Sequence, residues 1–228
     1  MPYVSQFSTK KSARRFKRPS RPNLKALVSR AIENSKETKY SQNTTLEIAA
    51  AKGNPPIFFD FSTLIPGTGS NSRVGNTVLC KQLGVRSIYN NNSSTAPTII
   101  REVVLEVNGG YYQSNTDIAT ALFEGGTDVT YSLFLDDCLR KIQKDGIRVL
   151  SDRLVTISAQ TVASSDSGIE TRKWSKKMNQ RLIFRDNAIA QPINKRYVVM
   201  VLARDPANDV GAGTTECTIC TEMYYKDM

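Results

Sequence analysis

Residues 77–107, TVLCKQLGVRSIYNNNSSTAPTIIREVVLEV, decide the fold class of this chain. They contain two runs that are rich in β-branched and aromatic residues, Thr77–Tyr89 and Thr98–Val107. The Asn, Ser, Thr and Pro residues between the runs are typical of a turn or loop. The stretch therefore predicts two β-strands joined by a connection.

The same composition continues on both sides of this pair, from Thr44 to the end of the chain. Seven further segments resemble strands and are separated by Gly, Asn, Asp, Ser and Pro: Thr45–Ala51, Ile57–Phe61, Ile147–Ser158, Glu170–Lys176, Arg181–Arg185, Arg196–Arg204 and Glu216–Tyr225. Nine candidate strands with hardly any long helical pattern indicate a sandwich or barrel rather than alternating βαβ units. We expect one all-β domain over residues 42–228.

One long interruption, Gly109–Gly146, separates the predicted strands Thr98–Val107 and Ile147–Ser158. Two short helices are predicted within it, Asp117–Phe123 and Leu133–Ile142. An insertion of this length usually decorates the surface or carries a function.

The composition is that of a chain with a single sizeable core. It has 228 residues, of which 39% are hydrophobic. No apolar run approaches the roughly eighteen residues of a membrane-spanning helix, and the N-terminus begins with polar and basic residues instead of an apolar signal core. The sequence predicts a soluble, unsecreted protein without membrane insertion.

The net charge of +10 is concentrated at one end of the chain. The first 41 residues hold eleven basic and two acidic residues, a net charge of +9, whereas residues 42–228 hold 20 basic and 19 acidic residues. The densest part contains seven basic residues and no acid: Lys10, Lys11, Arg14, Arg15, Lys17, Arg18 and Arg21. Residues 1–41 are thus predicted to form a separate basic arm.

Such an arm cannot bury enough apolar surface to offset its ordering, so we expect it to be disordered when unbound. Its natural partner is a polyanion, because Lys and Arg held near phosphates release condensed counterions and bind almost independently of sequence. The seven basic residues are the predicted nucleic-acid-binding residues. Two other interpretations stay open, an inert solubilising tail and a nuclear localisation signal in KKSARRFKR, residues 10–18.

A short helix is predicted after the basic cluster, from Leu24 to Glu37. Asn23 is a suitable N-cap, and Leu24, Leu27 and Ile32 recur at helical spacing. This apolar face either docks against another surface or frays in solution, since so short a helix is marginal on its own.

Residues that would support catalysis are scarce. The chain has no histidine, the side chain best suited to proton transfer near neutral pH, and it has no paired acidic motif, Walker loop or G-x-S-x-G elbow. Cys217 and Cys220 form a CxxC, but they lie in a predicted strand where residues three apart face opposite sides, and no second pair or histidine completes a zinc site. The other cysteines are Cys80 and Cys138. No enzyme, metal or cofactor is predicted.

Two stretches of the sequence carry a family resemblance. Gly67–Asn90, GTGSNSRVGNTVLCKQLGVRSIYN, with its Arg73-x-Gly75 loop before a long strand, resembles coat proteins of circovirus-like viruses, which have small circular single-stranded DNA genomes and encode a replication-associated protein. The second stretch is IRVLSDRLVTIS, residues 147–158, followed by the basic segment TRKWSKKMNQRLIF, residues 171–184. Both follow an arginine-rich arm, in the order seen in that family.

The resemblance implies a single eight-stranded jelly roll of two four-stranded antiparallel sheets. It also implies an icosahedral shell of about sixty copies of this chain around circular single-stranded DNA. The chain would then be located in the virion, and in the host nucleus during assembly, with nuclear import receptors as further partners. A coat protein of a small RNA or satellite virus, or a nucleic-acid-binding protein that does not assemble, fits the charge equally well, because counterion release does not distinguish DNA from RNA.

Two groups of residues within the resemblance have competing roles. Arg73 and Gly75 fit a turn that feeds a strand, in preference to a base-binding loop. The late basic residues flank Trp174 and could form a genome contact or a subunit contact, but a solvated strand face is the favoured interpretation. These residues are Arg172, Lys173, Lys176 and Lys177.

Overall fold

The computed structural model describes residues 38–48, 56–91, 97–122, 145–159, 168–185, 190–204 and 215–228. The chain divides into two units, residues 1–36 and 37–228, and all described residues belong to the second unit. The predicted helices Leu24–Glu37 and Leu133–Ile142 lie outside the described residues and stay predictions.

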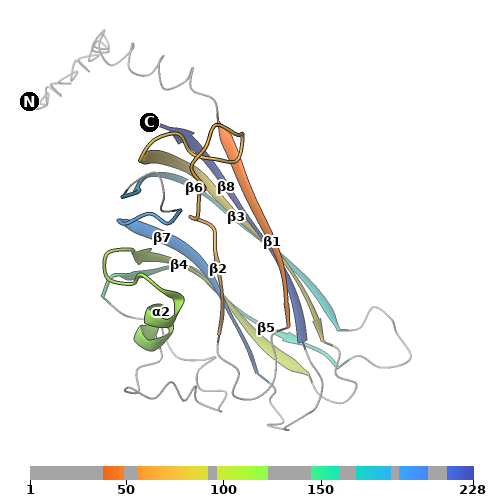
Figure 1. The fold of residues 1–228 in the computed structure, drawn as a ribbon. Helices are drawn as coiled ribbons and strands as arrows, with labels where there is room; N and C mark the ends of the chain where they lie inside the picture. The colour runs from red at the N-terminus through yellow and green to blue at the C-terminus, as the bar shows by residue number, and fades with distance from the viewer. Residues whose placement is uncertain are drawn as a thin grey trace, which may run out of the picture. The chain divides into compact units, whose positions relative to one another are not determined.

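Eight strands form two four-stranded sheets, and every pairing is antiparallel (Figure 1). The first sheet has the order β1-β8-β3-β6 and the second sheet has the order β2-β7-β4-β5. The strands are β1 (Lys39–Ile48), β2 (Ile57–Asp60), β3 (Thr77–Asn91), β4 (Thr98–Asn108), β5 (Ile147–Ile157), β6 (Ile169–Ile183), β7 (Lys195–Arg204) and β8 (Thr215–Asp227).

This strand order is that of a jelly roll. Following the chain, every connection crosses to the other sheet except the one from β4 to β5, and the long insertion lies in that connection. The predicted all-β fold of one eight-stranded jelly roll with two antiparallel sheets is therefore confirmed.

One predicted break in a strand is wrong. The segments Glu170–Lys176 and Arg181–Arg185 were expected to be separate strands, but β6 runs without interruption from Ile169 to Ile183. Three of the four residues between them are polar, Lys177, Asn179 and Gln180, and resemble a loop in sequence. They stay extended because β3 pairs with β6 along both strands, with one irregularity between Cys80 and Gln82.

The first strand also starts earlier than predicted, at Lys39 instead of Thr45. Its polar residues have little β-propensity, but they pair with the end of β8, where Lys39 lies opposite Tyr225. The Lys39 Nζ atom lies 2.8 Å from Asp227 Oδ2 and donates a hydrogen bond of 2.9 Å to the Ser72 carbonyl. Pairing with β8 therefore extends the strand beyond its apolar part.

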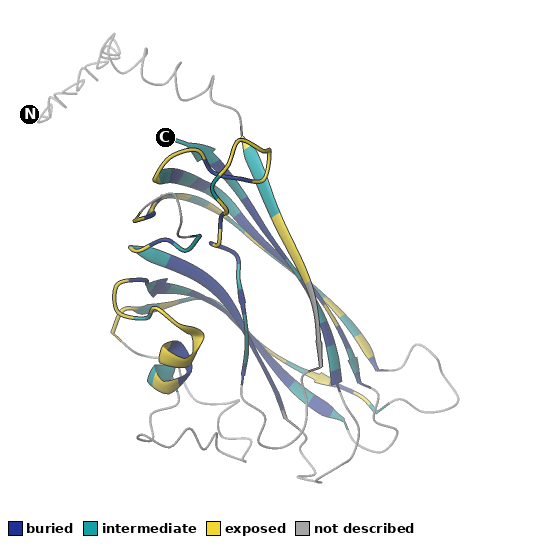
Figure 2. Cartoon of the chain, in the orientation of Figure 1, coloured by how far each residue is buried: buried dark blue, intermediate teal, exposed yellow. Residues whose placement is uncertain are grey.

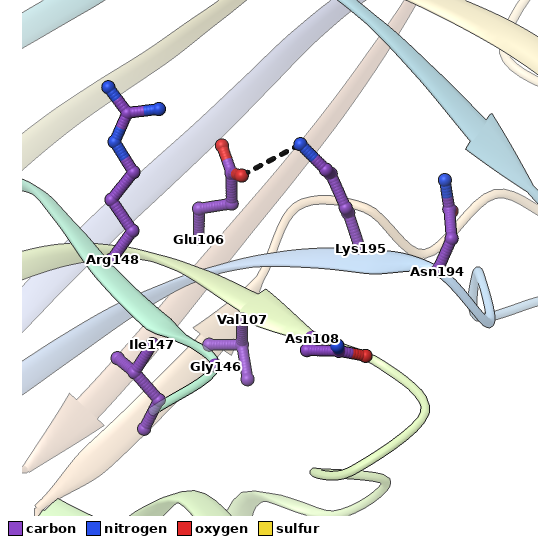
Figure 3. Close-up of a pocket in the computed structure, with 8 residues that line it drawn as sticks. All are labelled: Glu106, Val107, Asn108, Gly146, Ile147, Arg148, Asn194 and Lys195. Carbon is purple, nitrogen blue, oxygen red and sulfur yellow. Dashed lines mark hydrogen bonds and ion pairs between the residues drawn. The ribbon is translucent and has the colours of Figure 1, made fainter. Parts of the chain in front are cut away.

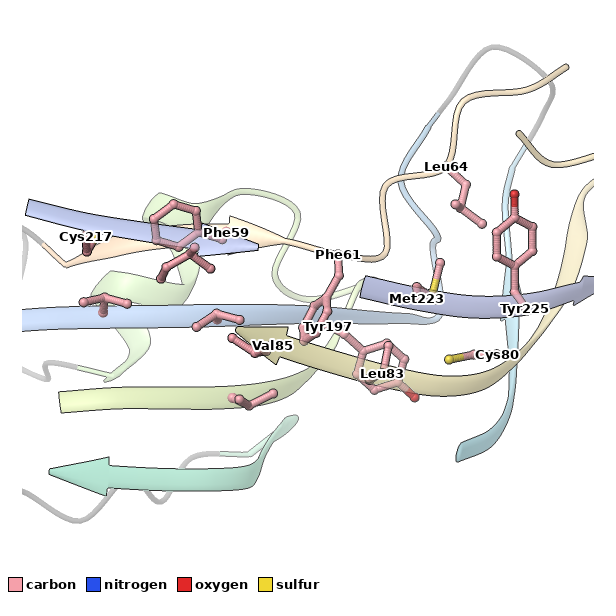
Figure 4. Packing of buried hydrophobic residues seen from close by; sticks show 14 of the residues in the cluster. Phe59, Phe61, Leu64, Cys80, Leu83, Val85, Tyr197, Cys217, Met223 and Tyr225 are labelled. Carbon is pink, nitrogen blue, oxygen red and sulfur yellow. The ribbon is translucent and has the colours of Figure 1, made fainter. Parts of the chain in front are cut away.

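The main core fills the space between the two sheets. Alternate side chains of β3 and β8 meet those of β4 and β7, and Figure 4 shows Leu83 and Val85 facing Tyr197 between the ribbons. Buried residues accordingly lie along the central strands, whereas exposed residues are frequent in the loops, on α2 and on the edge strands β1, β5 and β6 (Figure 2). One buried carboxylate joins the sheets across this core, since Glu102 of β4 accepts hydrogen bonds from the hydroxyls of Ser87 and Tyr89 of β3.

Helix α2 (Asn115–Leu122) covers the outer face of the second sheet. Its Ile118 packs on the apolar side chains of β4 and β7 that point away from the main core, including Val103 and Met200. The helix begins with a reciprocal cap: the Asp117 amide donates to Ser114 Oγ at 3.1 Å, and the Ser114 amide donates to Asp117 Oδ2 at 2.8 Å. This helix confirms the one predicted at Asp117–Phe123. Within the described ranges no helix is long and apolar enough to cross a membrane.

Candidate nucleic-acid interface

The seven residues predicted to bind nucleic acid lie outside the described residues, so their role stays a prediction: Lys10, Lys11, Arg14, Arg15, Lys17, Arg18 and Arg21. The basic residues that the structure does place are those of the jelly-roll domain. They include the late basic segment that flanks Trp174.

Strand β6 carries that segment at one edge of the first sheet, where β3 is its neighbour. Because side chains alternate along a strand, the basic residues divide between two faces. Arg172 and Lys176 share the partly buried side with Trp174, whereas Lys173 and Lys177 are exposed on the opposite side. The cluster that looked continuous in sequence is thus two groups.

The register with β3 identifies the two faces. Trp174 lies opposite Val85, which belongs to the main core, so Trp174 and its basic neighbours face the space between the sheets. Lys173 lies opposite Arg86, whose side chain is 58% exposed, so this face is the outer face of the first sheet. Three exposed basic residues of β6 follow one another on it, and we call them the outer basic row: Lys173, Lys177 and Arg181.

On β6 and on its neighbour β3, no acidic side chain compensates the charge of the outer basic row. β3 has no acidic residue, and the single acid of β6, Glu170, lies opposite Tyr89 and so belongs to the inner face. Two acids of β8 point to the outer face. Glu222 is paired with Arg86 at 3.0 Å and has a side chain only 11% exposed, and Glu216 lies opposite Asn90, level with the Ile169 end of β6. The outer face over β3 and β6 is therefore positively charged.

The edges of the two sheets approach each other at β5 and β6. The Arg153 Nη1 atom of β5 donates a hydrogen bond of 3.3 Å to the Lys173 carbonyl of β6. The two acids of these strands are ion-paired, Glu170 with Arg172 at 2.9 Å and Asp152 with the buried Arg101. Together β5 and β6 hold seven basic and two acidic residues, a net charge of +5, whereas the whole of residues 42–228 has a net charge of +1.

A small cavity of about 280 Å³ lies near the same edge, at one end of β4, β5 and β7 (Figure 3). Lys195 Nζ lies 2.9 Å from Glu106 Oε1 and 3.1 Å from Gln180 Oε1, so it ties the second sheet to β6. Figure 3 shows Arg148 extending to the same side as this pair. The lining residues hold charged and amide groups, and the Lys195–Glu106 ion pair lies among them.

Arg73 has the structural role that the sequence favoured. Its side chain is 1% exposed, its guanidinium carbon lies 4.2 Å from the centre of the Phe184 ring, and it donates hydrogen bonds to the Gly75 carbonyl and to Asn76. Gly75 has a φ of 82°, a conformation that side chains rarely adopt, so the turn requires glycine there. A base-binding role for Arg73 conflicts with this burial.

The two residues of the CxxC face opposite sides of β8, as predicted. Cys217 lies opposite Tyr89 in the main core, and Cys220 lies opposite Arg86 on the outer face. Among the described residues, no three His, Cys, Asp or Glu side chains are grouped so that they could hold a metal ion.

The comparisons with known proteins give similarity of structure alone. No family model matches the chain, and no curated protein matches it. The fold is similar to chains of solved virus structures. A chain of Desmodium yellow mottle tymovirus has a TM-score of 0.35 and 10% identity, with 85% of this chain and 90% of that chain covered. A chain of mud crab tombus-like virus has a TM-score of 0.32 and 10% identity, with 100% and 93% covered.

A chain of infectious bursal disease virus, Gx strain, is also similar, with a TM-score of 0.26 and 7% identity over 85% of this chain and 37% of that chain. All three chains come from structures of viruses. TM-scores below 0.5 are too low to support a function, so the proposal below is based on the topology and charge of this chain.

The outer basic row has the chemistry of a phosphate-binding surface. Its exposed cations alternate with exposed hydroxyl and amide groups, Ser175 and Asn179, which also donate hydrogen bonds to phosphates. Sequence analysis missed Arg181, and it grouped Lys173 and Lys177 with residues of the other face. The signal was present in the spacing, since every fourth residue of a strand returns to the same side.

Proposed function

We propose that this chain is the coat protein of a small virus, in which residues 42–228 build an icosahedral shell and residues 1–41 hold the packaged nucleic acid, without catalysis. One observation carries the proposal: an eight-stranded jelly roll is joined to a 41-residue segment that holds +9 of the net charge of +10, and +8 of this charge lies before β1 begins at Lys39. Because the domain is nearly neutral and the arm is polycationic, the domain is suited to assembly and the arm to nucleic-acid binding.

The architecture suits a subunit of a closed shell. Two sheets packed face to face complete one core, and the connections collect at the ends of the sandwich, where neighbouring copies can interlock. Copies related by closed symmetry use the same surfaces repeatedly, which is how one chain type builds a complete shell.

The arm supplies the electrostatic attraction. Each phosphate that it neutralises on a single strand contributes about 0.7 to the slope of log K against log salt concentration, so the seven residues of the densest cluster contribute about 5. In a shell of about sixty subunits, these seven residues alone bring on the order of 400 positive charges to the genome, which carries roughly one negative charge per nucleotide. The arm would neutralise part of a small genome, and counterions or further basic residues would neutralise the rest.

For the genome we propose circular single-stranded DNA, which the resemblance of residues 67–90 and 147–158 to circovirus-like coat proteins implies. The basic run KKSARRFKR would then also direct the protein to import receptors and to the host nucleus, where assembly takes place. A small RNA virus would use the same fold and the same arm. Treating nucleic acid extracted from purified particles with DNase or with RNase decides between the two genomes.

The proposal is tested with three proteins that all contain the complete jelly-roll domain. They are the wild type, a variant that lacks Met1–Arg21, and a neutral-arm variant of unchanged length in which the seven clustered basic residues are replaced by Gln. We expect all three to fold alike, because the core clusters of the described residues begin at Phe59 and include none of the arm. Both altered arms should package less nucleic acid, measured by absorbance at 260 and 280 nm and by extraction. Binding of a single-stranded oligonucleotide should lose about 5 from its salt slope with the neutral arm.

Two results would contradict this function. If particles of the neutral-arm variant contain as much nucleic acid as wild-type particles, the arm does not package the nucleic acid. Full-length protein that stays monomeric in light scattering and electron microscopy, over salt concentrations at which it is folded, would leave a nucleic-acid-binding protein that does not assemble.

A further inference from the structure

The outer face of the first sheet carries a positively charged surface to which the arm does not contribute. Lys173, Lys177 and Arg181 are all exposed there, and Lys81 of β3 reaches the same strand, with its Nζ 3.3 Å from Asn179 Oδ1. Within β3 and β6, none of the acidic residues points to this face. Isolated surface charges need no partner, but a row of cations without acids raises the local concentration of anions.

We propose that the outer basic row, with Lys81, contacts the phosphate backbone of the packaged nucleic acid, and that the outer face of the first sheet therefore lines the inside of the shell. This inference rests on the proposed function. It adds to that function a second contact surface, within the folded domain, and an orientation of the jelly roll in the shell.

The spacing of the row fits an extended polyanion. Successive members are four residues apart on one strand, which places their Cα atoms about 13 Å apart. Ser175 and Asn179 lie between them on the same face and add uncharged donors. Such a linear track follows a backbone and does not recognise bases, as in proteins that bind single strands without sequence preference.

The covalent connection of the arm supports the same orientation. Residues 1–38 join the domain at the start of β1, which is the opposite edge strand of the first sheet. β1 and β6 are three strand spacings apart, about 14 Å. The sheet register also brings the start of β1 level with the Arg181 end of β6, through Tyr225 of β8 and Cys80 of β3. The point at which the arm joins the domain is therefore close to the row.

The opposite face of the domain has a different character. The outer face of the second sheet is covered by α2, which buries Val103 and Met200. In the described part of the chain, the first sheet has no helix on its outer face. Among the described residues, the two outer faces therefore differ in what covers them.

A second copy of the chain is the competing occupant, because residues 42–228 have almost equal numbers of acids and bases and could supply acids to the row. The experiment separates the two partners. It uses the full-length chain with Lys173→Gln and Lys177→Gln, and a matched control with Arg148→Gln and Arg204→Gln, which removes the same charge from β5 and β7 of the second sheet. A third variant, Lys173→Arg and Lys177→Arg, keeps the charge.

Binding of a fluorescent single-stranded homopolymer to unassembled subunits is measured between 50 and 200 mM salt. Loss of two phosphate contacts should lower the salt slope of the Lys173/Lys177 Gln variant by about 1.4, so the wild type loses about sevenfold more affinity over this range. The control and the Arg variant should keep the wild-type slope. Equal urea midpoints for all variants show that folding is unchanged.

The inference is overturned if the Lys173/Lys177 Gln variant keeps the wild-type slope, or if the matched control loses as much, since the effect would then reflect total charge alone. It is also overturned if the Gln variant binds the homopolymer normally but no longer assembles, which identifies a subunit contact. The two proposals can fail separately. If the proposed function is wrong, the neutral-arm variant binds nucleic acid as the wild type does; if only this inference is wrong, the neutral-arm variant still loses binding and the Lys173/Lys177 Gln variant does not.

Discussion

Replacing Arg196 by Met should loosen the helix-covered face of the domain. The Arg196 side chain is 2% exposed, and its guanidinium donates to Asp60 Oδ2 from Nε at 3.1 Å and from Nη2 at 2.9 Å. It also donates to the carbonyls of Tyr112 and Gln113, at 3.1 and 2.8 Å, and to Asn115 Oδ1 at 3.0 Å. One buried cation therefore links β7, β2 and the segment that leads into α2.

The size of the effect follows from what the substitution leaves behind. Removing one partner of a buried ion pair usually costs about 3–5 kcal/mol, because the other charge loses its compensation. Asp60 keeps two donors on Oδ1, the amide and hydroxyl of Ser62 at 2.8 and 2.7 Å, so we expect the lower end, about 3 kcal/mol. For a domain of this size, that corresponds to a fall in Tm of about 6–12 °C.

The assay is urea unfolding of unassembled subunits, with a double-mutant cycle of Arg196→Met and Asp60→Asn. The double variant should be less destabilised than the sum of the two single variants, by about 1–3 kcal/mol. Hydrogen exchange should rise first in α2, which loses its attachment. A cost below about 1 kcal/mol for Arg196→Met, or costs that simply add, would refute the coupling argued from these contacts.

Two other predictions concern buried groups. Arg73→Gln should lower the free energy of unfolding by about 2 kcal/mol through loss of the cation–π contact with Phe184, without changing the salt slope of oligonucleotide binding; a changed slope would revive a base-binding role. Burial raises the pKa of Cys80 to about 12, from 9.0, so the unfolded chain ionises first and stability is lost as pH rises above 9. Between pH 8 and 10 the wild type should lose about 1.4 kcal/mol more than Cys80→Ala, and equal losses would contradict burial of the thiol.

Much of the fold follows from local sequence. The apolar runs of β3, β4 and β7 and the turn residues that end them are properties of short segments, and they predict these strands with nearly the observed bounds. β6 and β1 behave differently, because polar residues in each are kept extended by a partner far away in the chain, β3 or β8. Composition cannot predict pairing between distant strands, so the break within β6 was wrong and β1 was predicted to start too late.

The candidate site shows the same limit. The charge of the arm depends on composition alone and could be predicted directly, whereas the division of the late basic segment depends on which face of β6 meets the core. That face is fixed by Trp174 lying opposite Val85, a pairing between strands that are far apart in sequence. The structural role of Arg73 could be predicted from local sequence, because Gly75, two residues later, already indicated a turn.

Because β6 lies at the edge of its sheet, it could pair with the same strand of another copy and cause aggregation. An edge strand of 15 residues offers a long row of backbone donors and acceptors, a template for fibrils when protein accumulates at high concentration. Charged side chains point to both sides of this strand, including Arg172 and Lys176 toward the interior, where a second strand added at the edge would desolvate them. The same lysines and arginines would thus keep the edge from polymerising and leave other surfaces to direct assembly.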